Sequence, residues 1–252
     1  MRLDKYLSSA AALSRSEART AITKGQVTVN GAVCKKTDTP VAQADAVQLR
    51  GSLLVQEDYV YIMLHKPQGV VSAATDKSDV AVVDLVRDAF PRRQLFPAGR
   101  LDKTSTGFVL LTDDGSFAHD ILAPKRHVPK TYTVTLDTPL TQEMQKGFAA
   151  GVTLADGTQL GAAEVKAVSA DGYTVCVTLH QGVYHQIKRM FGVYGAGVNA
   201  LHRTAIGALT LDEKLAPGAF RQLTAQEVEK ITENREKRRN ARGGKFFRAV
   251  FH

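Results

Sequence analysis

The stretch that could carry chemistry runs from residue 98 to residue 115 and reads AGRLDKTSTGFVLLTDDG. Within it, Arg100 and Asp102 stand two residues apart in a glycine-initiated loop, and an apolar run follows over 108–111. A carboxylate at such a loop-to-strand junction is well placed to act as a nucleophile or a general base, because the strand fixes the loop that presents it. A structural interpretation competes with the catalytic one, in which Asp102 caps a turn.

Extended segments are expected on both sides of this loop. Residues 59–64 predict a buried strand, residues 65–69 predict a turn, and Asp113-Asp114 predicts another turn. Further strands are predicted over 108–112, 131–136, 173–179 and 206–211, and short helices over 79–90, 141–149, 184–194 and 224–232. Strands mixed with few helices predict an α+β fold for residues 59–231, with a mixed, largely antiparallel sheet.

The first 58 residues predict a small αα-β module of their own. Apolar residues recur at helical spacing over 3–10, and Ser14 with Glu17 has the spacing of a capping box that opens a second helix. Asn30-Gly31 then lies between short extended runs, which predicts a two-residue hairpin turn. Residues 50–58 are expected to form a linker.

The charge of the chain favours an anionic partner. Its 252 residues include 33 Lys and Arg against 25 Asp and Glu, a net charge of +8. Most of the excess lies in residues 232–252, which hold seven basic and two acidic side chains. This basic tail is either a solubilising extension or an electrostatic arm for RNA, whose phenylalanines could stack on bases.

The composition excludes several classes of protein. A hydrophobic content of 44% and a charged content of 23% exclude wholesale disorder. No apolar run reaches the roughly 18 residues of a membrane span and no signal core is evident, so we expect no membrane and a cytoplasmic location. Cys34 and Cys176 lack metal-ligand spacing, which argues against a disulfide framework and a zinc site.

Three segments of the N-terminal module resemble a known RNA-binding domain. They are RLDK from Arg2, SRSEA from Ser14 and GQVTVNG from Gly25, and they are similar to the small αL domain first recognised in a small-subunit ribosomal protein. The resemblance implies a helix pair that presents basic side chains to an RNA backbone, although a merely solvated helical face remains the alternative. The basic residues concerned are Arg2, Lys5, Arg15, Arg19 and Lys24.

The stretch over 98–115 resembles the catalytic loop of pseudouridine synthases, in particular the branch of the ribosomal small-subunit enzymes and their large-subunit relatives. That branch shows G-R-L-D, then T-G, an apolar run and T-[DN]-D-G. Three other segments agree in type and order: PKTYTV from Pro129, GVYHQIKRMF from Gly182 and LHR from Leu201. HKPQG from His65 is similar to the element N-K-P-x-G, with His where Asn is usual.

The resemblance implies a role for several of these residues. Asp102 would be the catalytic carboxylate, acting either as a covalent nucleophile or as a base. A nearby cation would keep it ionised in a pocket stripped of water, and the alignment gives this role to Lys188. Because many relatives carry Arg at that position, and Lys cannot form the same bidentate fork, Arg189 is the rival partner.

The remaining implied roles concern the RNA. Tyr132 would stack on the target uracil, with a buried sheet tyrosine as the alternative. Arg100 would fill the space that the flipped uridine leaves, and Arg203 would bind RNA. Tyr184, His185 and His202 are interpreted as structural or RNA-contacting.

We therefore expect a site-specific ribosomal RNA pseudouridine synthase that isomerises a uridine of the small-subunit (16S) RNA, as a monomer, without cofactor or metal. Its partner would be ribosomal RNA or a pre-ribosomal particle. Its expected parts are the RNA-binding domain with linker over 1–58, the catalytic domain over 59–231 and the tail over 232–252. The alternatives are a large-subunit (23S) target, which the basic tail favours, and a non-catalytic RNA-binding assembly factor.

Overall fold

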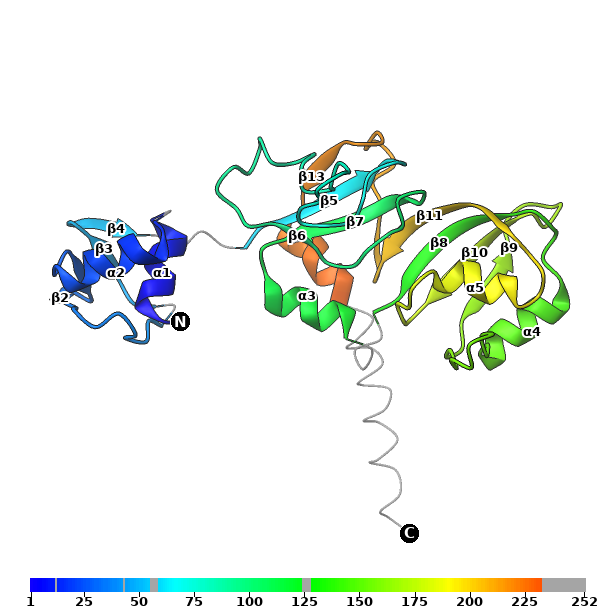
Figure 1. The fold of residues 1–252 in the computed structure, drawn as a ribbon, viewed down its shortest axis with the longest axis horizontal. Coiled ribbons are helices and arrows are strands. Elements are labelled where there is room, and N and C mark those ends of the chain that lie inside the picture. The colour runs from blue at the N-terminus through cyan, green and yellow to red at the C-terminus, as the bar shows by residue number, and fades with distance from the viewer. Residues whose placement is uncertain (12, 43, 55–58, 124–127, 233–252) are drawn as a thin grey trace, which may run out of the picture. The chain divides into compact units, whose positions relative to one another are not determined.

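The computed structural model describes residues 1–11, 13–42, 44–54, 59–123 and 128–232. The contacts divide the chain into two compact units, Met1–Tyr59 and a second one that begins at Val60, and each is described by itself (Figure 1). Beyond Thr232 the basic tail lies outside the described residues, so both interpretations of it stay open. The predicted bounds of the three parts also stay a prediction.

The N-terminal unit begins with the two predicted helices, α1 (Leu3–Ala10) and α2 (Arg15–Thr23). The capping box is confirmed, since Glu17 N donates to Ser14 Oγ over 3.2 Å and Ser14 N donates to Glu17 Oε2 over 2.8 Å. Leu7 and Ile22 are fully buried in the small core that the two helices share with a sheet.

That sheet has four strands in the order β2-β1-β3-β4, and every neighbouring pair is antiparallel. The Asn30-Gly31 hairpin is confirmed, because both residues have positive φ, 52° and 82°, as a type I′ turn requires. Arg50-Gly51 forms a second such turn, so the predicted linker over 50–58 is wrong for its first residues. The strands are β1 (Val27–Val29), β2 (Ala32–Val33), β3 (Val47–Leu49) and β4 (Ser52–Leu54).

The second unit is built on a nine-stranded sheet whose main path runs β13-β5-β7-β11-β8-β10-β9. All of its pairs are antiparallel except β7 with β11, which confirms the predicted α+β fold with a mixed, largely antiparallel sheet. The strands are β5 (Tyr61–Lys66), β6 (Phe96–Pro97), β7 (Thr106–Thr112), β8 (Lys130–Leu136), β9 (Glu164–Ala167), β10 (Thr174–Leu179), β11 (Val198–Ile206), β12 (Leu209–Thr210) and β13 (Phe220–Gln222).

Three of the four predicted helices are found in this unit, as α4 (Gln142–Ala150), α5 (Gln186–Gly192) and a helical segment over 225–232. The sequence prediction missed α3 (Gly115–Leu122), because Asp113-Asp114 was expected only to turn. Asp114 instead caps this helix, accepting a hydrogen bond of 2.9 Å from Phe117 N. Within the described part of the chain, every helix is too short or too polar to cross a bilayer.

The predicted helix over 79–90 is wrong. The segment forms successive turns, because Val82 N donates to Val71 O over 2.9 Å and Asp84 Oδ2 accepts from Ala81 N. These bonds engage donors that a helix would otherwise use, and three consecutive buried residues leave no polar face: Ala81, Val82 and Val83. The predicted strand over 206–211 is also wrong as one piece, since it breaks at Gly207, whose φ is 63°.

Strands β5 and β7, which pair with each other next to the loop that carries Asp102, are buried on both faces. Alternate residues of β5 and β7 point to opposite sides, so that Phe108 and Leu110 join one apolar cluster and Val109 and Leu111 join another. Figure 1 shows α3 and the helical segment over 225–232 covering one of these faces. This double burial gives the loop a rigid base.

Candidate active site

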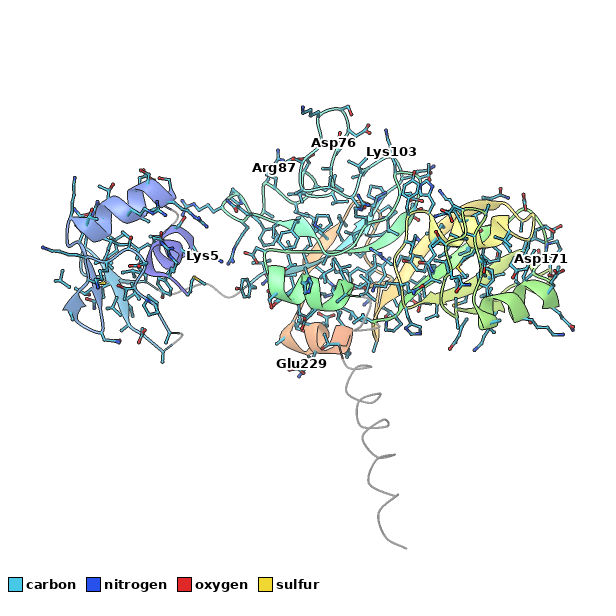
Figure 2. All side chains as sticks on the ribbon, turned by 60° about the horizontal axis from the view of Figure 1, so that its bottom comes forward. Lys5, Asp76, Arg87, Lys103, Asp171 and Glu229 are labelled. Carbon is cyan, nitrogen blue, oxygen red and sulfur yellow. The ribbon has the colours of Figure 1, made fainter. Side chains whose placement is uncertain are left out.

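An open cavity of about 820 Å³ lies in the second unit. Its walls come from the segment 71–76, the loop 97–105, the start of β8, the segment 179–188 and the middle of β11. Asp76 and Lys103, which both line it, lie on the same side of this unit (Figure 2). The motifs that are far apart in the sequence therefore converge on one cavity.

The backbone next to Asp102 is fixed by a buried serine. Ser72 is 8% exposed. Its Oγ donates to Leu101 O over 2.9 Å and accepts from Leu101 N over 3.0 Å. Ser105 N closes the other side by donating to Asp102 O over 3.0 Å. The carboxylate thus stands on a loop whose conformation is determined by tertiary hydrogen bonds.

Lys66, at the end of β5, fastens the same loop from beneath. Its side chain is fully buried, and Nζ donates to Ser105 O over 2.7 Å, to Pro67 O over 2.9 Å and to Lys103 O over 3.4 Å. Burial lowers the pKa of Lys66 to about 8, although the Asp102 carboxylate nearby acts to raise it. Lys66 is not among the site residues predicted from the sequence, although it lies in the HKPQG segment.

Asp102 itself contacts two basic side chains from the GVYHQIKRMF segment. Lys188 Nζ lies 3.1 Å from Oδ2, and His185 Nε2 lies 3.3 Å from Oδ1. Lys188 also donates to Thr104 Oγ1 over 3.3 Å. Arg189, the rival partner, pairs with Asp156 instead, so the structure gives the ion pair with Asp102 to Lys188. The Asp102 side chain is 29% exposed, which leaves it accessible from the cavity.

Tyr132 and Arg100 line the same cavity from different places. Tyr132 lies on β8 and is 8% exposed, so its ring is part of the wall. Arg100 is exposed, two residues before Asp102. Tyr132 therefore combines the two interpretations given to it, because a sheet tyrosine here is also a cavity residue.

Arg203, predicted to bind RNA, is one of the residues that line the cavity, but it is only 3% exposed. Nε donates to Phe108 O over 2.6 Å, while Nη2 is buried and has no hydrogen-bond partner among the described residues. Lys130 lies in the same wall and donates from Nζ to Ile121 O over 3.1 Å. Burial, and then the charge of Arg203, lower the pKa of Lys130 to about 8.

We expect Lys130→Met to alter how stability depends on pH. The pKa of Lys130 is about 8 in the folded protein and 10.5 in the unfolded chain. Between these values the unfolded chain binds more protons, so the free energy of unfolding of the wild type rises with pH. Relative to Lys130→Met, the wild type should gain about 2 kcal/mol between about pH 7 and pH 9.5. Urea unfolding at both pH values measures this difference.

The control for this experiment is Lys146→Met on α4, where the side chain is exposed. Its difference from the wild type should stay constant over the same range of pH. A Lys130→Met difference that is equally constant would contradict the lowered pKa.

The predicted RNA-binding residues of the N-terminal unit are all exposed, and two of them share one carboxylate. Asp4 is 4% exposed and lies 3.1 Å from both Arg2 Nη2 and Arg19 Nε. Burial acts to raise the pKa of Asp4, but the hydrogen bonds from Arg19 and Arg2 outweigh it and hold the pKa below its ordinary value. The buried Asp4 thereby orients two exposed guanidinium groups. The exposed set is Arg2, Lys5, Arg15, Arg19 and Lys24.

His202 supports the sheet next to the cavity. Its Nδ1 lies 2.8 Å from Thr106 Oγ1 across the β7–β11 pair, and its ring meets that of His65 edge to face at 5.4 Å. These contacts support the structural interpretation of His202. Among the described residues, no group of three or more His, Cys, Asp or Glu side chains could hold a metal ion.

Comparisons with known proteins agree with this geometry. The sequence model of the family described as RNA pseudouridylate synthase matches residues 60–192, and the model of the S4 domain matches residues 1–47. The first match includes Asp102, Tyr132 and Lys188, and the second includes the Arg2–Asp4–Arg19 cluster.

Whole-length relatives give the same result. The ribosomal small subunit pseudouridine synthase A of Vibrio vulnificus is 40% identical over 232 residues, which cover 92% of this chain and 99% of that protein. The uncharacterized RNA pseudouridine synthase YtzG of Bacillus subtilis is 38% identical, with the same coverage. A solved structure described as a pseudouridylate synthase is 39% identical and superposes with a TM-score of 0.65, covering 92% of this chain and 99% of its own.

Proposed function

The chain belongs to the RNA pseudouridylate synthase family and carries an S4 domain, and from that premise we propose that it converts a specific uridine of small-subunit ribosomal RNA to pseudouridine. The predicted enzyme class, an RNA pseudouridine synthase, is confirmed. The small-subunit target rests on relatives such as that of Vibrio vulnificus, which the chain matches over nearly its whole length.

The observation that carries the chemistry is the Asp102–Lys188 ion pair inside a cavity large enough for a nucleotide. Pseudouridine formation breaks the bond between N1 and C1′, joins C1′ to C5, removes the proton from C5 and places a proton on N1. This isomerisation consumes no oxidant and no co-substrate. A carboxylate at C1′ or C2′ can start it, as a nucleophile or as a base, and we assign this role to Asp102.

Lys188 supports that role through charge. The ammonium 3.1 Å from the carboxylate offsets its negative charge, and this attraction strengthens when RNA covers the cavity and water leaves. Lys66 and Ser72 act through the loop backbone, so we assign them positioning roles. Each removes freedom from the loop that presents Asp102.

The target uridine must leave its stack to reach Asp102, at a cost of a few kcal/mol. We propose that Tyr132 stacks on the extruded uracil, since its ring forms part of the cavity wall. Arg100, exposed at the cavity, is suited to fill the vacated space and contact the RNA backbone. One copy of the chain should suffice, because all of these residues come from one unit of one chain.

The N-terminal unit is proposed to bind the RNA backbone, and Arg19→Ala tests this. Arg19 is exposed and oriented by Asp4, as a phosphate contact requires. We expect weaker binding of all RNA sequences alike and a salt slope, the change of log K with log salt, that is smaller by about 1. Filter binding at several salt concentrations measures both, with Lys146→Ala on α4 as the control. An unchanged slope would contradict the assignment.

The experiment that tests the proposed function is a map of pseudouridines in ribosomal RNA from cells with and without this protein. One small-subunit position should lose its pseudouridine without the protein and regain it when the protein is restored. A loss confined to large-subunit RNA would instead establish the alternative target. If no position changes, the proposed function is wrong.

A further inference from the structure

Tyr184 is an exposed aromatic residue at the cavity. It is 71% exposed, the largest fraction among the exposed large hydrophobic residues of the described chain. Its ring stacks on that of His185, with centroids 3.9 Å apart and an angle of 16° between the planes. One face of the tyrosine ring is therefore covered by imidazole, and so much exposure leaves the opposite face open to solvent.

The imidazole beneath Tyr184 is tied to the reaction centre. His185 Nε2 lies 3.3 Å from Asp102 Oδ1. His185 also has a φ of 50°, and the other two non-glycine residues of the described chain with positive φ, Asn30 and Arg50, lie in hairpin turns. No hairpin explains the conformation of His185, and an uncommon backbone geometry of this kind is typical of functional sites.

Hydrogen bonds fix the backbone that carries Tyr184 and His185. Gln186 is 5% exposed, and its Oε1 accepts from Val183 N over 3.1 Å, while Gln186 N donates to Val183 O over 3.1 Å. Arg189 N then donates to His185 O over 2.9 Å, which joins the segment to α5. An exposed ring on a fixed backbone is preorganised for a partner, since little conformational entropy is lost on contact.

The chemistry of the surroundings selects the partner. A flat ring with one free face fits another flat ring. The cavity that Tyr184 lines also carries three basic side chains, Arg100, Lys103 and Lys188, against the two carboxylates of Asp76 and Asp102. A nucleotide combines a planar base with a negatively charged phosphate, and an unpaired base stacks on an aromatic side chain with little dependence on sequence. Tyr184 thus meets the requirements for a stacking contact with RNA.

We propose that Tyr184, backed by His185, is a stacking platform for the unpaired base next to the target uridine. The proposal rests on the proposed function for its substrate. The platform would hold the RNA strand beside the cavity while the uridine itself occupies the cavity with Asp102. It therefore contributes to substrate binding rather than to the chemical step.

The test uses the full chain and a short single-stranded RNA with one uridine and with 2-aminopurine on its 5′ or its 3′ side. Stacking quenches 2-aminopurine, so binding to the wild type should quench the fluorescence from one of the two sides. Tyr184→Ala should lose this quenching and Tyr184→Phe should retain it. For pseudouridine formation, Tyr184→Ala should raise KM by about 5- to 100-fold with kcat within about twofold of the wild type.

The matched control is Tyr173→Ala, which removes a tyrosine that is 39% exposed and absent from the cavity lining. It should leave quenching and KM unchanged. Quenching that persists in Tyr184→Ala, or a KM equal to that of the wild type, would overturn the platform and leave the proposed function standing. If the ribosomal RNA map shows no dependence on the protein, the proposed function fails, while loss of quenching in Tyr184→Ala would still support the platform.

Discussion

Asp102→Asn should lower the rate of pseudouridine formation by at least about 100-fold while leaving RNA affinity within about twofold of the wild type. Asparagine keeps the shape of the side chain but can neither attack a carbon as a carboxylate does nor accept a proton at neutral pH. If Asp102 acts only as a base, the rate should fall by about 10²- to 10⁴-fold. If Asp102 is the nucleophile, no turnover should remain. Single-turnover assays of pseudouridine, together with filter binding, measure the two quantities separately.

Affinity should survive because the side chains proposed to contact the RNA backbone do not include Asp102. The variant even removes a negative charge from a cavity that faces a polyanion. Asp156→Asn is the matched control, since Asp156 also pairs with a basic residue of the GVYHQIKRMF segment, Arg189. It makes the same chemical change and should leave the rate near that of the wild type. An equal loss of rate and affinity in Asp102→Asn would sink the catalytic assignment.

The parts of the fold that the sequence predicts well are those determined by neighbouring residues. The Ser14–Glu17 capping box and the Asn30-Gly31 turn each depend on a few consecutive positions, and both are found. The segment over 79–90 fails because its hydrogen bonds are not local. Val82 donates to Val71, eleven residues away, and no pattern of helical spacing records that contact.

The candidate site shows the same contrast between features that short sequence motifs predict and features that depend on distant contacts. The ordered motifs group Asp102, Tyr132 and Lys188, and the structure brings all three to one cavity. Lys66 and Ser72 are missed because most of their contacts are with backbone carbonyls and amides of the Asp102 loop, 29 to 39 residues away, and the sequence does not record which distant backbone atoms a side chain reaches.

The choice between Lys188 and Arg189 needed geometry. Adjacent residues of a helix point about 100° apart, so only one of the two can face a given carboxylate. The sequence does not record the rotation of α5 about its axis, and in the structure that rotation turns Lys188 toward Asp102 and Arg189 toward Asp156.

Gly107→Ala should destabilise the second unit by at least about 4 kcal/mol, which corresponds to a fall in Tm of about 8 °C or more. A Cβ at this position would lie 2.3 Å from Arg203 O and 2.6 Å from Arg203 N, and the φ of 106° is unfavourable for alanine. Calorimetry of the full chain should show the transition of the second unit shifted and that of the N-terminal unit unchanged.

The size of this effect follows from where Gly107 lies in the sheet. It pairs with Lys66 on one side and with Arg203 on the other, and the parallel β7–β11 ladder that joins the two halves of the sheet consists of two residue pairs. An added methyl group must therefore separate the strands at their narrowest junction. The same shift would displace Lys66, which pairs with Gly107 and donates to Ser105 O in the Asp102 loop. Activity should therefore fall together with stability.

Two other glycines allow the backbone strain at positive φ to be measured separately from the steric clash of an added Cβ. Gly157 has a φ of 81° with nothing within 4 Å of its Cβ position, so Gly157→Ala should cost only the backbone strain, about 1–2 kcal/mol. Gly115 has neither a positive φ nor a neighbour, and at the start of α3 its change to Ala should be neutral or stabilising by up to about 1 kcal/mol. If Gly107→Ala costs no more stability than Gly157→Ala, the β7–β11 junction accommodates the added methyl group without a loss of stability. In that case the rigidity inferred for the Asp102 loop cannot come from the sheet, and it must rest on the hydrogen bonds of Lys66 and Ser72 alone.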